Sequence, residues 1–73
     1  MKYVLYEITD SYDIVIKVSI ATESFLEEFM SQHTKDKNYI PNYLVLEFDE
    51  YDDLLSVTSY KQGKISKKDV LND

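Results

Sequence analysis

Two stretches near the start of the chain alternate between apolar and polar side chains with the two-residue period of a β-strand. In residues 3–9 one face consists of Val4, Tyr6 and Ile8. In residues 13–20 one face consists of Ile14, Ile16, Val18 and Ile20. Asp10 and Ser11 lie between the two stretches and favour a turn. The pattern predicts an antiparallel hairpin whose isoleucine-rich face points toward the core.

From Thr22 the apolar spacing changes to that of an amphipathic helix, carried by Phe25, Leu26, Phe29 and Met30. Thr22 is the expected N-cap, and a capping box starting at Ser24 is the alternative. His33, Lys35 and Lys37 lie near the far end, where positive charge favours the helix dipole. We expect one helix of about three turns.

The second half of the chain predicts a loop, strands and turns. Residues 34–42 are polar and contain Pro41, which indicates a loop. Residues 43–49 alternate again, and residues 54–60 are rich in strand formers, with Leu55 and Val57 expected to point inward. The alternative for the latter is a short helix over residues 51–57. Gly63 predicts a turn before a brief fifth strand at 64–66, and we expect residues 66–73 to be a frayed tail or one helical turn.

This order predicts an α+β fold over residues 1–73 as a single small domain. We expect a two-layer sandwich of β-β-α-β-β order, with a mostly antiparallel sheet and one amphipathic helix packed on one face. A three-stranded sheet with helices is the alternative. The predicted core consists of Val4, Tyr6, Ile8, Ile14, Ile16, Val18, Phe25, Leu26, Phe29, Met30, Leu44, Leu46, Phe48 and Val57.

Composition narrows the function classes. The 73 residues carry 14 acids and 8 lysines, a formal net charge of -6, which argues against direct binding of nucleic acid or an anionic membrane. Arginine and cysteine are absent, which excludes bidentate arginine clamps, disulfides and thiolate metal sites. No signal-like or membrane-spanning stretch is evident, so a cytoplasmic location is expected. Residue types with A/T-rich codons are common, which points to a low-GC bacterium or its phage.

The densest charge feature is the run 47–53, in which five of seven residues are acidic. It contains no glycine and does not fit a calcium-binding loop, so no metal or other cofactor is expected. A solvated turn and a recognition surface both remain open. For the second alternative the expected partner-binding residues are Glu23, Glu27, Glu28, Glu47, Asp49, Glu50, Asp52 and Asp53.

The seven tyrosines are the second feature. The predicted phase of the strands places several apolar residues on the sheet face away from the helix, where they need to be covered. Tyrosine suits such surfaces because it combines a large ring with a polar hydroxyl. The predicted oligomer interface is Tyr3, Leu5, Val15, Tyr43 and Val45.

No catalytic constellation is visible. His33 is the single histidine and has no partner at a recognisable catalytic spacing, so we interpret it as a partner of the helix dipole. We therefore expect a protein-binding function and no enzyme. The sharper hypothesis is an acidic inhibitor of a phage or mobile element, whose carboxylates imitate nucleic-acid phosphates and block a basic nucleic-acid-binding protein. The alternative is a structural or assembly protein, a homodimer or larger homo-oligomer, that pairs through a tyrosine-rich sheet face.

Overall fold

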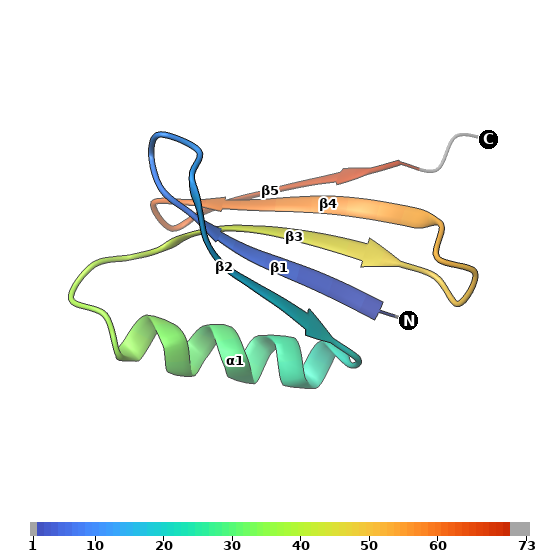
Figure 1. Cartoon of the computed structure of the whole chain (residues 1–73), viewed down its shortest axis with the longest axis horizontal. Helices are drawn as coiled ribbons and strands as arrows, with labels where there is room; N and C mark the ends of the chain where they lie inside the picture. The colour runs from blue at the N-terminus through green and yellow to red at the C-terminus, as the bar shows by residue number, and fades with distance from the viewer. Residues whose placement is uncertain (1, 71–73) are drawn as a thin grey trace.

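The computed structural model describes residues 2–70, which form a five-stranded antiparallel sheet with one helix on one face (Figure 1). The elements are β1 (Lys2–Ile8), β2 (Ile14–Ile20), α1 (Glu23–Lys35), β3 (Asn42–Phe48), β4 (Leu54–Lys61) and β5 (Lys64–Asp69). The strands lie in the order β2-β1-β3-β4-β5, so α1 carries the chain from an edge to the centre of the sheet. The predicted two-layer α+β fold is confirmed.

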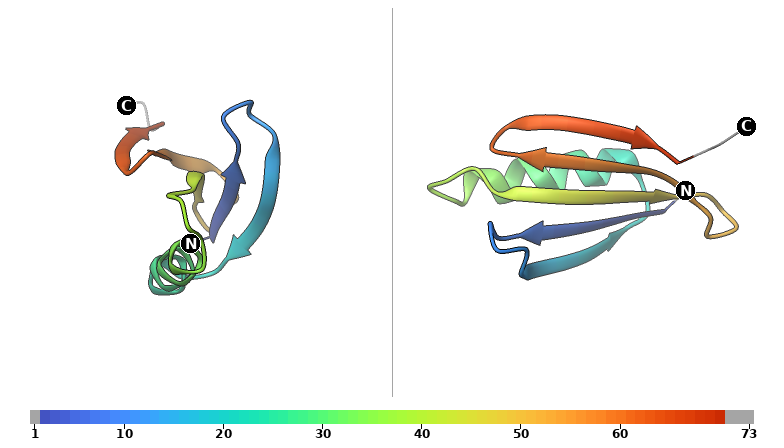
Figure 2. Two further views of the ribbon diagram at one scale, coloured as in Figure 1. Left: turned by 90° about the vertical axis from the view of Figure 1, so that its left-hand side faces the viewer. Right: turned by 90° about the horizontal axis from the view of Figure 1, so that it is seen from above.

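Figure 2 shows the two layers from the side and from above. In its right-hand view all five strands lie in front of α1, and no other described element lies in front of them. We call the sheet side that α1 covers the helix face and the opposite side the open face. A binding surface on the sheet is available only where no described element covers it, which is the open face.

The structure rules out two alternatives for the second half of the chain and changes two expectations. The short helix over residues 51–57 and the three-stranded sheet are both wrong, because this segment is a turn followed by β4. The fifth strand is longer than residues 64–66, since β5 pairs with β4 from Lys64 to Asp69. The expected frayed tail therefore begins inside a strand, and residues 71–73 lie outside the described part.

The turns after β1 and β3 share one backbone geometry. In each turn the fourth residue, Tyr12 or Asp52, donates its N–H to the carbonyl of the first, at 2.9 and 3.1 Å, and has a positive φ of 67° or 64°. The first residue, Thr9 or Asp49, accepts a second bond through its side chain from the N–H four residues on, at 3.1 and 3.0 Å. Side-chain oxygens of this kind stabilise turns. Residues 49–53, which make up most of the acidic run 47–53, therefore form a hydrogen-bonded turn.

The turn between β4 and β5 contains Gly63, as predicted. Gln62 and Gly63 both have positive φ, 53° and 82°. Two consecutive left-handed residues define the tight turn whose twist matches that of the flanking strands, and glycine adopts this conformation without steric cost. The turn aligns Lys61 opposite Lys64.

Helix α1 begins as its sequence predicts. The Thr22 side chain accepts a hydrogen bond from the backbone N–H of Phe25 at 3.2 Å, which confirms Thr22 as the N-cap. His33 and Lys35 lie in the last turn, where positive charge offsets the helix dipole. The loop from Asp36 to Pro41 then returns the chain to the sheet, and Pro41 is buried.

The core lies between α1 and the helix face. Its buried apolar residues are Tyr3, Leu5, Ile20, Leu26, Tyr43 and Val45. Strand pairing explains this set, since residues directly opposite one another in neighbouring strands share a face. Leu5 is opposite Val18 in β2 and opposite Val45 in β3, so these three side chains point toward the helix together.

The predicted core is therefore correct for Val18 in β2 and for Leu26, Phe29 and Met30 in the helix, but it has the wrong phase for the other strands. On the open face lie Val4, Tyr6, Ile8, Leu44, Leu46, Phe48, Leu55 and Val57, all half-buried. Ile14 and Phe25 are exposed. The sequence left open which face of β1 and β3 points toward the helix, because both strands carry apolar residues on both faces. Only the pairing with the isoleucine-rich face of β2 determines the inward face.

Candidate functional site

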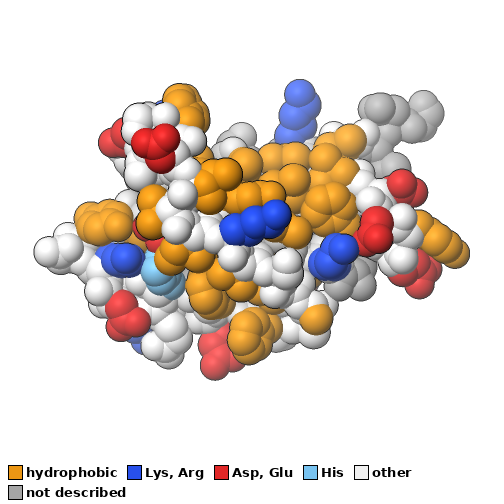
Figure 3. All heavy atoms as spheres, in the orientation of Figure 1, with side chains coloured by type: hydrophobic (Ala, Val, Ile, Leu, Met, Phe, Trp, Pro, Cys, Tyr) orange, Lys and Arg blue, Asp and Glu red, His pale blue; other side chains and the backbone are white. Residues whose placement is uncertain are grey.

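The open face is an uncovered apolar surface. Its centre is formed by alternate residues of the three middle strands, Val4, Tyr6, Ile8, Leu44, Leu46, Phe48, Leu55 and Val57, which we call the apolar strip. Figure 3 shows hydrophobic side chains gathered above the helix, with lysines among them. Contiguous apolar patches of this kind mark interaction sites on soluble proteins.

Charge is segregated between the two faces of the sheet. By register, five of the eight lysines belong to the open face: Lys2, Lys17, Lys61, Lys64 and Lys68. The three acids within strands, Glu7, Glu47 and Asp69, all belong to the helix face. The open face is therefore basic in a protein whose net charge is -6.

Two of these lysines lie over aromatic rings of the apolar strip. The Lys17 ammonium is 5.6 Å from the centre of the Tyr6 ring, and the Lys2 ammonium is 5.7 Å from that of Phe48. Each contact is a cation–π interaction that places a positive charge at the border of the strip. Lys2 also forms an ion pair with Asp52 at 2.8 Å.

The β1–β2 turn rises on the open side of the sheet (Figures 1 and 2). Between this turn and the ends of β3 and β4 is a groove of about 300 Å³, lined by Tyr12, Leu44, Ser59 and Lys61 among others. Tyr12 is 77% exposed and has the positive φ that a bulky residue rarely adopts. A strained, exposed aromatic residue beside an apolar groove is typical of a contact position.

The structure does not place the residues of the predicted oligomer interface on the sheet face where we expected them. Tyr3, Leu5, Tyr43 and Val45 are 0–8% exposed beneath α1, so the expectation that they face away from the helix is wrong. Val15 is 55% exposed at the irregular end of the β1–β2 pairing. The uncovered sheet face that these residues were expected to form exists, but the apolar strip forms it.

The eight predicted acidic partner-binding residues do not form one surface. Glu47 is half-buried and accepts hydrogen bonds from Tyr3 at 3.4 Å and Ser56 at 3.0 Å. Asp49 accepts two backbone bonds of its turn, and Asp52 is paired with Lys2. The remaining five are exposed: Glu23, Glu27, Glu28, Glu50 and Asp53.

Glu23 and Glu47 are brought together from different elements. Both line a groove of about 420 Å³ between α1 and strands β3 to β5. Burial raises the pKa of the Tyr3 phenol, and these two carboxylates raise it further. Burial also raises the pKa of Tyr43 and Tyr60, with Glu27 and Glu23 adding to the effect at Tyr60.

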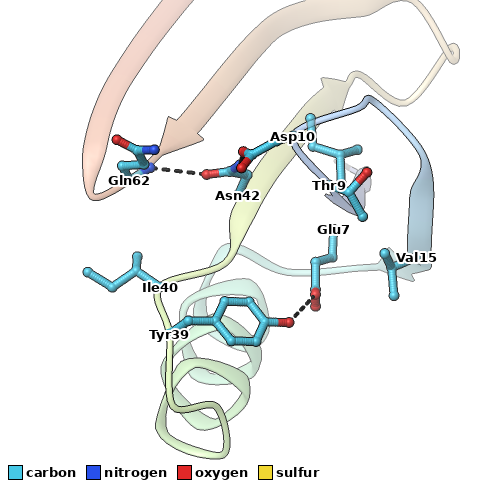
Figure 4. A pocket seen from close by; sticks show the side chains of 9 residues that line it. Glu7, Thr9, Asp10, Val15, Tyr39, Ile40, Asn42 and Gln62 are labelled. Carbon is cyan, nitrogen blue, oxygen red and sulfur yellow. Dashed lines mark hydrogen bonds between the residues drawn. The ribbon is translucent and has the colours of Figure 1, made fainter.

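A third hollow, of about 410 Å³, lies at the end of β1 beside a buried carboxylate (Figure 4). Glu7 is 3% exposed, and Figure 4 shows its carboxylate directed toward the Tyr39 hydroxyl, which donates to Oε2 at 3.3 Å. Its other oxygen, Oε1, pairs with Nε2 of His33. Val15 and Ile40 form apolar walls of the hollow.

Sequence reasoning missed the Glu7–His33 pair. The two residues are 26 positions apart, so no spacing motif connects them. The pair gives a buried carboxylate its partner and ties the end of α1 to β1, and Phe29 stacks on the His33 ring at 5.7 Å. Both Glu7 carboxylate oxygens already have hydrogen-bond partners, so we assign this carboxylate a structural role.

Comparison with known proteins gives no family: no protein-family model, curated protein or solved structure matches the chain. Within residues 2–70, no group of three or more histidine or carboxylate side chains is arranged to hold a metal ion. Likewise, no helix in that range has the length and apolar character needed to cross a bilayer.

Proposed function

We propose that this chain is a small protein-binding domain that works through the open face of its sheet. The observation that supports the proposal is the apolar strip, eight half-buried side chains with no described element over them. A sheet with one apolar face in water is normally covered by a second layer. In this proposal that layer is a partner protein. We also propose that the protein is located in the cytoplasm.

The charge pattern supports a protein partner further. Five lysines border or flank the apolar strip, while the strand acids lie on the other face. Protein interfaces combine an apolar centre with a polar rim, and a rim of one charge selects a partner of the opposite charge. The partner surface is therefore apolar at its centre and carries acidic groups at its rim.

The test compares the proteins that three tagged forms of the chain capture from a low-GC bacterial lysate, the wild type and two variants. The Leu46→Asp variant places a charge in the centre of the strip. The Phe25→Asp variant makes the same chemical change on the helix, where Phe25 is 56% exposed. A partner captured by the wild type and by Phe25→Asp but lost with Leu46→Asp is the expected result.

Circular dichroism of each variant shows whether it is folded before capture is interpreted. If the same proteins are retained by the wild type and by a folded Leu46→Asp variant, the open face is not the binding surface. Should Leu46→Asp fail to fold, Leu46→Lys and Val57→Lys serve as replacements, because a long lysine side chain can extend its charge to solvent.

A second candidate is the acidic inhibitor of a nucleic-acid-binding protein. It is favoured by one observation: five exposed acids form no ion pair with any described residue, namely Glu23, Glu27, Glu28, Glu50 and Asp53. Such a surface binds basic sites with an affinity that falls steeply with salt. Charge reversal at Glu27 and Glu28 then abolishes capture of a basic partner, whereas Leu46→Asp leaves it unchanged.

A further inference from the structure

We infer that the partner segment on the open face is an acidic amphipathic helix that lies along the apolar strip. This inference rests on the proposed function and names the kind of partner that the same surface takes. The apolar stripe of the helix packs on the middle strands β1, β3 and β4, and carboxylates on both of its flanks pair with lysines of the outer strands. The shape of the strip, the positions of the lysines and a groove at one end support it.

The apolar strip is long and narrow. It occupies three neighbouring strands, so it is about 10 Å wide between the outer two. Along β1 it extends from Ile8 to the level of Phe48, which is opposite Lys2, over about 20 Å. A helix is about 10–12 Å across and rises about 1.5 Å per residue, so one helix of about 13 residues covers the strip. On the other face, the 13 residues of α1 lie along the strands in the same way (Figure 2).

The two outer strands carry polar side chains on the open face. By register, β2 contributes Lys17 and Ser19, and β5 contributes Lys64, Ser66 and Lys68. A second sheet packed on the open face would cover these strands as well and would bury their ammonium groups, which is costly. A helix on the three middle strands leaves the ammonium groups at its sides. The surface therefore fits a helix better than a sheet.

Lysines lie on both sides of the strip at complementary levels. Pairing across the five strands places Lys17 level with Ser66, midway between Lys64 and Lys68 in β5. None of these three lysines forms an ion pair with a described residue. The outer strands are about 19 Å apart, so long lysine side chains reach the flanks of a helix between them. A helix with carboxylates on both flanks is therefore the electrostatic complement of the open face.

The lysine positions also set the spacing of the acids on the partner helix. Lys64 and Lys68 are four residues apart in an extended strand, which is about 13 Å. On one flank of a helix, residues seven or eight positions apart are separated by about 10–12 Å. The partner therefore carries two acids about two turns apart on the flank that faces β5, and one acid between their levels on the flank that faces Lys17.

The composition of the strip favours a protein helix over nucleic acid. Six of its eight side chains are valine, isoleucine or leucine. Its two rings, Tyr6 and Phe48, each have a lysine ammonium of the same chain over them, at 5.6 and 5.7 Å. Sheets that bind single-stranded nucleic acid stack bases on free aromatic rings. The apolar side chains of an amphipathic helix suit an aliphatic surface instead.

A groove at one end of the strip supplies a site for a single large side chain of the helix. The groove of about 300 Å³ lies between the raised β1–β2 turn and the ends of β3 and β4, and Ile8, Tyr12 and Leu44 line part of it. Tyr12 is 77% exposed at this turn. One apolar residue of the helix enters the groove, and the Tyr12 ring packs against it.

Binding of model helices to the purified full chain tests the inference. The probe is a fluorescent peptide of about 16 residues with leucines at helical spacing and glutamates on both flanks, stapled on its outer side so that it is helical in water. Fluorescence anisotropy is expected to give a dissociation constant below about 100 μM. Two matched peptides, with serine in place of leucine or lysine in place of glutamate, are expected to bind at least about tenfold more weakly.

Charge reversal on the chain tests the lysines on both sides of the strip. The variant Lys17→Glu with Lys68→Glu is expected to raise the dissociation constant of the acidic peptide by about tenfold or more and to bind the lysine peptide instead. The matched control, Lys35→Glu with Lys67→Glu, reverses two charges off the open face. At physiological ionic strength it is expected to change either affinity by less than about threefold, because distant exposed charges are screened. Circular dichroism shows whether each variant is folded, and Lys17→Gln with Lys68→Gln replaces a glutamate variant that is not.

Four results would overturn the inference. The first two are no binding of the acidic peptide at about 1 mM chain and equal binding of the serine peptide. The third is equal weakening by the control pair, which would place the acidic peptide on another surface. The fourth is a better occupant: a single-stranded oligonucleotide that displaces the peptide at a lower concentration, or a dimer in sedimentation velocity that excludes it.

The capture experiment separates this inference from the proposed function. If the acidic peptide does not bind but a lysate protein is captured in a Leu46-dependent way, the open face binds a partner of another shape and only the inference fails. If the peptide does not bind and no capture depends on Leu46, both fail.

Discussion

At the scale of single residues, the pairing of Glu7 with His33 is the feature that the sequence conceals. The position of His33 near a helix end was predictable, because the apolar spacing defines the helix. Its carboxylate partner was not, since Glu7 lies in a strand whose phase was ambiguous. Once Leu5 faces the helix, alternation places Glu7 on the same side, and a buried carboxylate needs a donor.

Removing one member of this pair is expected to destabilise the fold. His33→Ala leaves the buried Glu7 carboxylate with only the long Tyr39 hydrogen bond, and the expected loss is about 3 kcal/mol of unfolding free energy. The double variant Glu7→Leu with His33→Phe replaces the pair by apolar groups and should recover most of the loss. Urea unfolding measures both. Equal losses in the single and double variants would contradict a buried, coupled pair.

Alkaline pH is expected to destabilise the protein through its core phenols. The pKa values of Tyr3, Tyr43 and Tyr60 are raised in the folded state, first of all by burial. The free energy of unfolding that these phenols contribute is fully present below the unfolded tyrosine pKa of about 10. It is lost as the pH rises through their pKa values in the folded state. Unfolding free energy should therefore fall above about pH 10, and less steeply in Tyr43→Phe. A flat profile in the wild type would contradict this assignment.

At the scale of elements, the type and approximate bounds of the helix and of β1 to β4 were predictable, whereas β5 is longer than the predicted residues 64–66. Alternation identifies β1, β2 and β3, and Thr22 marks the start of α1. The inward face of β1 and β3 was not predictable. Alternation shows that residues take turns between two faces, but it does not show which face is inward when both contain apolar residues. The same ambiguity misplaced the candidate interface: its residues, Tyr3 and Tyr43 among them, are core residues.

The β1–β2 turn is expected to show opposed effects on stability and binding. Tyr12 has a φ of 67°, a conformation that asparagine tolerates better than tyrosine. Tyr12→Asn should therefore stabilise the monomer by up to about 1 kcal/mol in urea unfolding. It should also weaken capture of the partner protein, because the exposed ring is lost. A variant that is less stable and captures the partner normally would contradict both the strain and the contact role.

At the scale of the whole molecule, net charge conceals how charge is distributed. A total of -6 predicts an acidic surface, yet register gathers five of the eight lysines on one face of the sheet. Composition cannot show this, because it depends on which residues pair across strands. The acidic run 47–53 is likewise divided among a turn, an ion pair and the helix face. The molecule therefore has a basic, apolar open face opposite an acidic helix.

The most direct test of the central claim is the solvent accessibility of the apolar strip in the free chain. A soluble paramagnetic agent broadens NMR signals of exposed methyl groups, so Leu44, Leu46 and Val57 report on the open face. The prediction is strong broadening of these methyl signals in dilute protein, while the methyl signals of Leu5 and Val45, buried beneath α1, stay sharp. Strip methyl groups that are as well shielded as those of Leu5 and Val45 would contradict the claim that the open face is uncovered and available to a partner.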